Sequence, residues 1–155
     1  MNEKIVVRRA AAKDAGAVID LITALAEFEK LEPPDAAARE RCVAEMQRER
    51  PRFETFLVED DGKAAGCAIV YETWGSFNAM PKLYLEDIIV LPEYRGRGVG
   101  KALFQAIIGE AELRGCGMME WTALDWNTPA HQFYKKMGAR HLEAWQVYRL
   151  DLTAR

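Results

Sequence analysis

The spacing of hydrophobic and polar residues changes several times along the N-terminal part of the chain, and each change marks the start of a predicted strand or helix. Residues 4–10 are rich in β-branched side chains, which predicts a short strand. Residues 14–28 carry apolar side chains at helical spacing, and Asp14 is the predicted cap of this helix. A second, more polar helix begins at Asp35 and ends near residue 50. The front of the chain therefore predicts one strand followed by two helices.

The middle of the chain predicts three strands. Residues 53–59 and 64–73 are joined by an Asp-Gly turn that suits a hairpin. Residues 82–90, KLYLEDIIV, are nearly all apolar after Asp87, which is typical of a central strand buried on both faces. Residues 73–81 contain glycine, asparagine and aromatic side chains, and they predict a loop between the last two strands.

The remaining elements alternate between helix and strand, and they cover residues 98–114, 118–124, 128–138 and 144–152. Thr128 is the predicted N-cap of the last helix, Pro129 occupies its first position, and Gly138 ends it. The final strand alternates apolar and polar positions. The order β-α-α-β-β-β-α-β-α-β predicts a single α/β domain over residues 1–155.

Composition narrows the class of protein. The net charge is −3 and half of the residues are apolar, which argues against a general affinity for nucleic acid or anionic membranes. The N-terminal region lacks a long apolar segment, so neither a signal peptide nor a membrane span is predicted. Three widely spaced cysteines suit reduced thiols in the cytoplasm. Two histidines and no paired-cysteine motif predict no metal site.

A glycine-rich and basic stretch, YRGRGVG, lies between the apolar strand and the helix that follows it. Such a loop presents free backbone N–H groups at the positive end of the helix dipole, and glycine lets a ligand approach them closely. With Arg95, Arg97 and Lys101, the loop predicts a site for phosphate, above all a pyrophosphate. Its spacing differs from that of the dinucleotide fingerprint and of the P-loop. A basic glycine turn that only caps the helix is the alternative.

Arg95-x-x-Gly98-x-Gly100 after LEDIIVLPEY resembles the acetyl-CoA loop of the GNAT superfamily of N-acyltransferases. The stretches LYLEDIIVLPEYRGRGVG, DWNTPAHQFYKKMGA and LITALAEFEKLE most resemble diamine (spermidine/spermine-type) and thialysine N-acetyltransferases. The resemblance covers the whole chain and implies an α/β GNAT fold, a mixed central sheet with a splayed central strand, flanked by helices. It also implies a homodimer and acetyl-CoA as the co-substrate.

The resemblance further implies which residues hold acetyl-CoA. The loop amides hold the pyrophosphate, the backbone of residues 88–90 pairs with the pantetheine arm like an added strand, and the start of the last helix adds contacts. The implied cofactor-binding residues are Ile88, Ile89, Val90, Arg95, Gly96, Arg97, Gly98, Val99, Gly100, Lys101, Asn127, Thr128, Pro129, Ala130 and Tyr134. Asn127 has an alternative structural role, which is to fix the loop before the last helix.

The chemistry of acetyl transfer requires proton management, because an alkyl amine with a pKa of about 10 or higher is protonated at neutral pH. Glu86 and Asp87 are adjacent on the predicted central strand, where neighbours point to opposite faces. Only one of them is then expected to face the acceptor, and the resemblance implies that this catalytic residue is Glu86. A backbone N–H near Ile88 is a candidate to stabilise the oxyanion. A solvated acidic pair is the alternative for the two carboxylates.

Tyr134 is the second predicted catalytic residue. It lies in FYKKMGA on the last predicted helix and matches the tyrosine that acts as general acid in this superfamily. A phenol placed beside the sulfur can protonate the departing CoA thiolate. Spacing alone slightly favours the alternative, in which Phe133 and Tyr134 are core aromatic residues, whereas the motif favours the acid role.

The acceptor site is predicted around the junction of the first two helices. The resemblance places Phe28 and Glu29 in contact with the amine, and Glu86 and Asp87 complete the predicted substrate-binding residues. Further candidate charges and walls are Glu27, Glu32, Asp35, Trp74, Phe77 and Trp126. A charge run at a helix junction is often only solvated, and Trp126 has a core role as its alternative. Gln146 stands where polyamine enzymes carry an acidic residue, which leaves thialysine-like and lysine-like amines open.

Together with these residues, the resemblance predicts an N-acetyltransferase that moves the acetyl group of acetyl-CoA to the primary amine of a small molecule by direct attack. The predicted protein is a cytoplasmic homodimer without metal, nucleic-acid or membrane partners. Two rival functions stay open. One is acetylation of a protein or peptide amine, and the other is a non-catalytic acyl-CoA-binding sensor.

Overall fold

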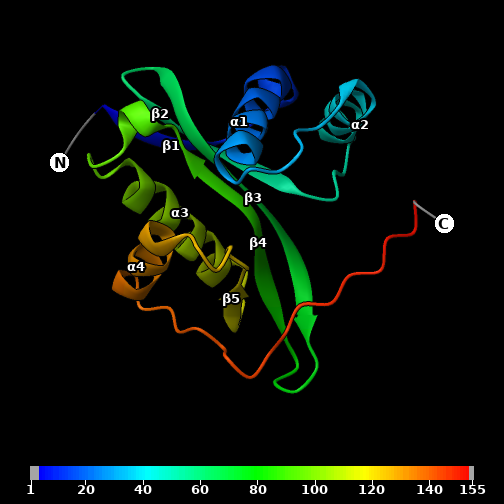
Figure 1. Ribbon diagram of the computed structural model, residues 1–155, viewed down its shortest axis with the longest axis vertical. Helices are drawn as coiled ribbons and strands as arrows, with labels where there is room; N and C mark the ends of the chain where they lie inside the picture. Colours follow the sequence, from blue (N-terminus) through cyan, green and yellow to red (C-terminus); the bar gives the residue numbers. More distant parts are fainter. Residues whose placement is uncertain (1–3, 154–155) are drawn as a thin grey trace. The chain divides into compact units, whose positions relative to one another are not determined.

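Residues 4–153 are described by the computed structural model, and the chain divides into two units between Thr122 and Ala123. The first unit contains a five-stranded sheet with the helices α1, α2 and α3, and the second contains α4 (Figure 1). The strands are β1 Ile5–Arg9, β2 Glu54–Asp60, β3 Lys63–Gly75, β4 Met80–Val90 and β5 Met118–Glu120. The helices are α1 Ala15–Phe28, α2 Ala36–Met46, α3 Val99–Leu113 and α4 Thr128–Lys136, with 3-10 turns η1 Ala12–Asp14 and η2 Pro92–Tyr94.

The strands follow one another in the order β1-β2-β3-β4-β5. Neighbours from β1 to β4 are antiparallel, whereas β4 and β5 are parallel. The parallel pairing requires a crossover, and α3 supplies it. The sheet is therefore mixed, which confirms the predicted α/β class.

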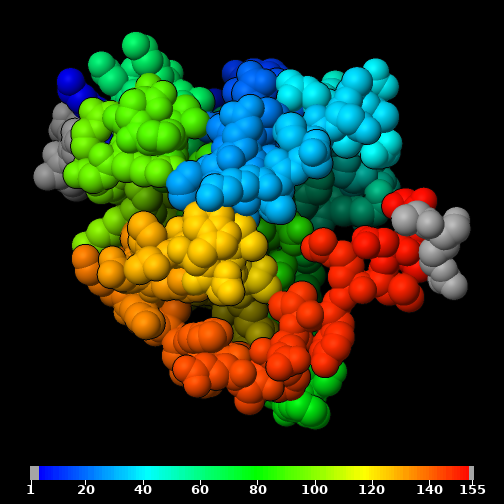
Figure 2. Space-filling view, viewed as in Figure 1, coloured from blue at the N-terminus to red at the C-terminus, as the bar shows by residue number. Residues whose placement is uncertain are grey.

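Both faces of the sheet are covered by helices. Side chains alternate along each strand, so Leu57 and Cys67 point to the face where they pack with Val18 of α1. Their neighbours Val58 and Ala68 are also buried, on the opposite face, which α3 contacts. Figure 2 shows α1 and α2 beside each other on the surface of the first unit. Each fully buried aliphatic side chain stabilises the fold by about 1.5–3 kcal/mol.

Strand β4 has two irregularities. It pairs with β5 only from Lys82 to Tyr84, so its remaining length has no neighbour on that side within residues 4–153. On its other side, Ile69 of β3 lies opposite Asp87, while the next residue of β3 lies opposite Leu85. Glu86 is the extra residue of a β-bulge. The early end of the parallel pairing confirms the predicted splay of the central strand.

The first helices differ from the prediction in detail. Asp14 precedes α1, but its carboxylate accepts hydrogen bonds from the N–H of Ala11 and from Arg8 and does not cap the helix. Asp35 does cap α2, accepting from the N–H of Ala38 at 2.8 Å. Helix α2 ends four residues before the predicted end, because Glu45 accepts hydrogen bonds from the backbone and side chain of Arg52 and thereby draws the following chain back.

Two predicted boundaries in the sheet are wrong. The predicted loop 73–81 is mostly strand, because cross-strand pairing continues to Gly75 and Met80 at the tip of a long hairpin. Strand β5 stops at Glu120, four residues before the predicted end. In both cases pairing with the neighbouring strand, which local sequence does not report, sets the boundary.

The second unit differs from the prediction in the cap of α4 and in the final strand. Asn127, rather than Thr128, is the N-cap of α4, and its side chain accepts from the N–H of Ala130 at 3.4 Å. Gly138, with φ of 92°, follows the end of α4 as predicted. The predicted final strand 144–152 does not form. A strand needs a neighbour for its backbone hydrogen bonds, and in the described part of the chain none pairs with this segment.

Candidate active site

The loop between β4 and α3 has the backbone conformation that its glycines predict. Gly98 is the N-cap of α3 with φ of 81°, and Gly96 has φ of 75°, a region that side chains other than glycine rarely adopt. A Cβ atom built at either glycine would meet only open space. The surface above the loop is therefore free for a ligand to approach.

The amides of this loop are unusually available. Among the described residues, no group accepts a hydrogen bond from any backbone N–H between Gly96 and Lys101. The first bond of the helix runs from the N–H of Ala102 to the carbonyl of Gly98 at 3.0 Å. Unpaired N–H groups at a helix N-terminus, reinforced by the helix dipole, suit an anion such as phosphate.

The two arginines of the loop have partners within the protein. Arg97 forms an ion pair of 2.9 Å with the buried Asp60 of β2. Arg95 donates to the carbonyl of Val90 at 3.0 Å and lies 4.8 Å from the ring centroid of Phe28, at the end of α1. Both guanidinium groups therefore hold the loop against the rest of the first unit. Lys101 is exposed and forms no ion pair with any residue from 4 to 153.

The carboxylates of β4 come together at the bulge. Asp87 lies opposite Ile69, and Tyr71, two residues further along β3, points to the same face. The hydroxyl of Tyr71 donates to Oε2 of Glu86 at 2.7 Å. The expectation that Glu86 and Asp87 point to opposite faces is therefore wrong, because the bulge interrupts the alternation of the strand.

The carboxylates create an acidic environment. Burial raises the pKa of Asp87 to about 6, and the charges of Glu86 and Glu29 contribute further. Burial also raises the pKa of Glu29, which is the C-cap residue of α1. None of these three carboxylates has a lysine, arginine or histidine within ion-pair distance in the described chain. This cluster, Glu29, Glu86 and Asp87, is called the unpaired acidic cluster below.

The charge of Asp87 also acts on two thiols, those of Cys67 and Cys42. Burial raises the pKa of Cys67 to about 12, and the neighbouring charge of Asp87 adds to the effect. Burial and Asp87 raise the pKa of Cys42 in the same way. Both cysteines are free, and they are held as neutral thiols.

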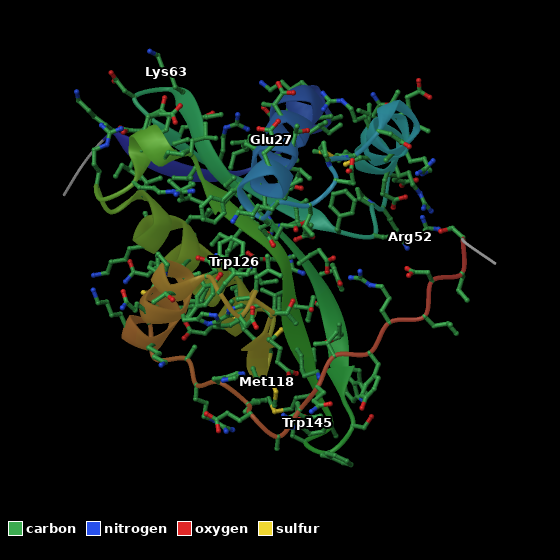
Figure 3. All side chains as sticks on the ribbon, viewed as in Figure 1. Glu27, Arg52, Lys63, Met118, Trp126 and Trp145 are labelled. Atoms are coloured by element: carbon green, nitrogen blue, oxygen red, sulfur yellow. The ribbon has the colours of Figure 1, made fainter. Side chains whose placement is uncertain are left out.

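The other predicted acceptor residues lie on several elements. Glu27 on α1 is exposed (Figure 3). Glu32, after the helix, is also exposed, whereas the carboxylate of Asp35 is used as the cap of α2. Trp74 lies on β3 and Phe77 at the tip of the hairpin, and both are exposed.

The second unit carries the remaining predicted residues. Tyr134 is half-buried on α4, with its ring centroid 5.8 Å from that of Phe133 in an edge-to-face arrangement. Asn127 caps this helix, and Trp126 just before it is exposed, which differs from a core role (Figure 3). The ring of His131 is hydrogen-bonded through Nε2 to the carbonyl of Leu124 at 2.9 Å.

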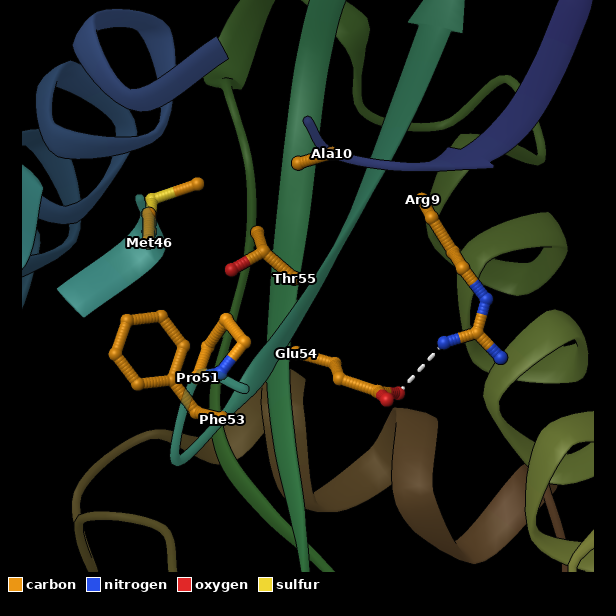
Figure 4. A pocket seen from close by; sticks show the side chains of 7 residues that line it. All are labelled: Arg9, Ala10, Met46, Pro51, Phe53, Glu54 and Thr55. Carbon is orange, nitrogen blue, oxygen red and sulfur yellow. Dashed lines mark hydrogen bonds and ion pairs between the residues drawn. The ribbon is translucent and has the colours of Figure 1, made fainter. Parts of the chain in front are cut away.

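A small pocket of about 90 Å³ lies at the start of β2 (Figure 4). It is lined by Arg9, Ala10, Met46, Pro51, Phe53, Glu54 and Thr55. The hydroxyl of Thr55 is buried and has no hydrogen-bond partner in the described chain. The pocket shares no residue with the predicted site.

Sequence reasoning missed Tyr71 and Tyr84. Their rings pack at a centroid distance of 5.4 Å on the face that carries the acidic cluster. Counting the hairpin register would have placed Tyr71 near Glu86, but the bulge that decides which hydroxyl meets which carboxylate has no local sequence signal.

The described residues hold neither a metal-binding group nor a membrane-spanning helix. Residues 4–153 contain no group of three or more histidine, cysteine, aspartate or glutamate side chains arranged to hold a metal ion. Within that same range, no helix has the length and apolar character needed to cross a membrane.

Comparison with known proteins identifies the class. The model of the Acetyltransferase (GNAT) family matches residues 19–139. A thialysine N-epsilon-acetyltransferase from Sus scrofa is 34% identical over 161 residues, which cover 95% of this chain and 92% of the relative. An L-ornithine N5-acetyltransferase from Arabidopsis thaliana is 38% identical over 104 residues, 66% of this chain and 46% of the relative.

Solved structures share the fold. The crystal structure of an aminoglycoside acetyltransferase from an uncultured soil metagenomic sample superposes with a TM-score of 0.76 at 21% identity, covering 97% of this chain and 99% of that one. Together with the sequence matches, this confirms the resemblance seen in the loop motif. The chain belongs to the GNAT acetyltransferase family. It is an acetyl-CoA-dependent N-acetyltransferase.

Proposed function

We propose that this enzyme acetylates the primary amine of a small molecule, either a diamine or a lysine-like amine such as thialysine. The observation that carries the proposal is the unpaired acidic cluster, because three neighbouring carboxylates without a protein cation suit a cationic ligand. The stack of Arg95 on Phe28 links the end of α1 to the glycine loop, so acceptor and cofactor residues share one region. The names of the thialysine and ornithine relatives support an amine of this kind.

The glycine loop fits the pyrophosphate of acetyl-CoA, which supplies an acetyl group as a reactive thioester. The unpaired amides from Gly96 to Lys101 would hold the phosphates, and Lys101 would add charge. The free edge of β4 at residues 88–90 would pair with the pantetheine arm, and residues 127–130 would add contacts. Arg95 and Arg97 would act chiefly by holding the loop.

Two side chains would move protons. The carboxylate of Glu86 accepts a proton from the substrate ammonium, directly or through one water, so that the nitrogen lone pair can attack the acetyl carbonyl. A bond forms between nitrogen and the carbonyl carbon, and the carbon–sulfur bond breaks. The hydroxyl of Tyr134 gives its proton to the departing sulfur, and the second proton that the nitrogen loses as it becomes an amide returns to the tyrosinate, directly or through water. Asp87 and Glu29 hold the positive charge of the amine.

The test is thiol release from acetyl-CoA against polyamines, diamines, amino-acid amines and peptides. We expect the highest kcat/KM for a small primary amine. Tyr134→Phe should lower kcat by roughly 10²-fold or more, the scale of a general acid, while acetyl-CoA affinity changes little because the ring is kept. Gly98→Val should abolish acetyl-CoA binding in calorimetry, because a β-branched residue is strained at this positive φ. A preference for peptides would favour a protein acetyltransferase, and acetyl-CoA binding without thiol release would favour a sensor.

We also propose that residues 1–155 act as one domain in a cytoplasmic homodimer. The free cysteines suit a reducing compartment. The apolar segment 144–152 is unpaired, and its alternating pattern suits a strand supplied with a neighbour by a second copy. Light scattering should give twice the chain mass, and Val147→Asp should shift the protein toward monomer. A wild-type monomer at micromolar concentration would contradict the homodimer.

A further inference from the structure

One tyrosine outside the predicted site contacts the proposed catalytic carboxylate. The hydroxyl of Tyr71 lies 2.7 Å from Oε2 of Glu86, a distance typical of a hydrogen bond from O–H to an ionised oxygen. Tyr71 is half-buried on β3 and its ring packs on that of Tyr84 from β4. Glu86, by contrast, is an exposed residue at a bulge, where no ladder pairing fixes it.

We propose that Tyr71 is a positioning residue of the acetyl transfer, which holds Glu86 so that its second carboxylate oxygen faces the amine. This inference rests on the proposed function of Glu86. A glutamate has three side-chain torsions, and an exposed one samples several rotamers unless a partner holds it. The bond from Tyr71 commits Oε2 and leaves Oε1 as the oxygen that can take the amine proton. Holding a catalytic group in one orientation contributes to rate through positioning.

The tyrosine is suited to this task because its hydroxyl keeps its proton. Burial raises the pKa of Tyr71 well above its usual value, and the hydrogen bond to Glu86 and the nearby charges of Glu86 and Asp87 act in the same direction. The hydroxyl is thus a hydrogen-bond donor throughout the working pH range. A lysine in its place would neutralise the carboxylate and compete with the substrate ammonium, whereas a phenol orients the oxygen and leaves the negative charge available.

Among the groups around Glu86, only the hydroxyl of Tyr71 is hydrogen-bonded to its carboxylate. Asp87 adjoins it, and the charge of Glu29 at the end of α1 acts on Asp87, but no hydrogen bond to either side-chain carboxylate occurs in the described residues. Tyr84 packs on Tyr71, and its hydroxyl donates no hydrogen bond to any residue from 4 to 153. The pair of tyrosines therefore provides its own control, since only one of two packed hydroxyls reaches the carboxylate.

The test compares Tyr71→Phe with Tyr84→Phe, each alone and with Glu86→Gln. Both tyrosine variants keep the ring, so thermal melting should show equal and small changes. A hydrogen bond to a charged group is worth a factor of about 10–100. We expect Tyr71→Phe to lower kcat/KM for the best amine by about that factor, with KM for acetyl-CoA unchanged. Tyr84→Phe should stay within about threefold of wild type.

The double variant distinguishes positioning from packing. In the Glu86→Gln background, Tyr71→Phe should lose less than about threefold more, because the carboxylate it serves is already gone. Equal kcat/KM values for Tyr71→Phe and Tyr84→Phe, or an undiminished loss in the Glu86→Gln background, would overturn the inference while the proposed function stands. A wild-type enzyme without activity on any amine would instead overturn the proposed function, and the inference with it.

Discussion

Two clusters of charge in the first unit are built in opposite ways. In the paired network, Arg9 bridges Glu54 at 2.7 Å and Glu110 at 2.5 Å, and Arg114 bridges Glu54, Glu72 and Glu110. These residues join β1, β2, β3 and α3, and every carboxylate has an arginine. In the unpaired acidic cluster, Glu29, Glu86 and Asp87 have only one another and the hydroxyl of Tyr71.

The pKa of each carboxyl group depends on whether an arginine is hydrogen-bonded to it. Burial alone would raise the pKa of Glu110, but hydrogen bonds from Arg114 and Arg9 outweigh it and lower that pKa. Burial raises the pKa of Asp87 to about 6 because no cation opposes it. The carboxylates of the paired network are neutralised by arginines of the same chain and help to hold the elements together. The carboxylates of the unpaired acidic cluster have no such arginine, so their ionisation lowers the stability of the protein, but it leaves a negative site that can bind a cation. The contrast can be tested residue by residue.

The largest effect is expected for Glu86→Gln, which keeps the shape of the side chain and removes its charge. We expect kcat/KM for the amine to fall roughly 10²-fold or more at pH 7, the scale of a lost general base. The pH–rate profile should move upward, because free amine must then come from ionisation in bulk water. Glu54→Gln, in the paired network, is the matched control and should leave kcat/KM unchanged. An unmoved profile in Glu86→Gln would show that another group manages the proton.

Asp87→Asn should affect both binding and stability. The folded-state pKa of Asp87 is raised from 3.8 to about 6, so ionising it makes folding less favourable as pH rises through this interval. The variant should therefore be more stable than wild type at pH 7.5, by on the order of 2 kcal/mol, and nearly equal near pH 4. Urea denaturation at both pH values measures this.

The same substitution changes the amine KM. Above about pH 6 the wild-type cluster gains a negative charge at Asp87, so KM for a cationic amine should fall between pH 5 and 7. In Asp87→Asn this part of the pH dependence should be absent, and KM at pH 7.5 should be about tenfold higher. A variant that is less stable than wild type at pH 7.5 would mean that Asp87 has a compensating partner.

Glu110→Gln should change the stability less than Asp87→Asn does, and in the opposite direction. It removes a carboxylate that accepts from two arginines, so we expect a loss of about 1 kcal/mol in the free energy of unfolding at pH 7. Because the pKa of Glu110 is lowered, its contribution is present above its ordinary pKa and is lost as pH falls below it. Denaturation curves of the variant and wild type should converge in acid, while kcat/KM stays the same throughout. An activity loss would link the network to the site.

The smallest effect concerns a neutral group without a partner. The hydroxyl of Thr55 is buried beside the small pocket at the start of β2, and Thr55→Val removes it while keeping the side-chain shape (Figure 4). Stability should rise by up to about 1 kcal/mol, because an unsatisfied buried hydroxyl is lost. Thr55→Ser, which keeps the hydroxyl and loses a methyl group, should instead be destabilised. A destabilised Val variant would show that the hydroxyl is satisfied in solution.

Most of the fold could be predicted because its signals are local. The apolar run of β4, the helical spacing in α1 and the glycine loop before α3 each carry their signal within one segment. The roles of Tyr134 and Asn127 in chemistry stay predictions, although Asn127 has a second task as the cap of α4. The sequence pattern of a helix cap could not predict that the carboxylate of Asp14 accepts from Arg8 and does not cap α1, because Arg8 lies on the preceding strand.

The amino-acid sequence by itself determined the order of the elements through α4, the positive-φ loop at Gly96 and Gly98, and the family. Periodicity and glycine placement act over a few residues, so no distant partner is needed to express them. Only the tertiary structure decided that Glu86 and Asp87 share a face, that Tyr71 holds Glu86, and that residues 144–152 form no strand in this chain. Register, bulges and strand pairing are set by hydrogen bonds to another segment, and one segment's pattern cannot specify what lies beside it.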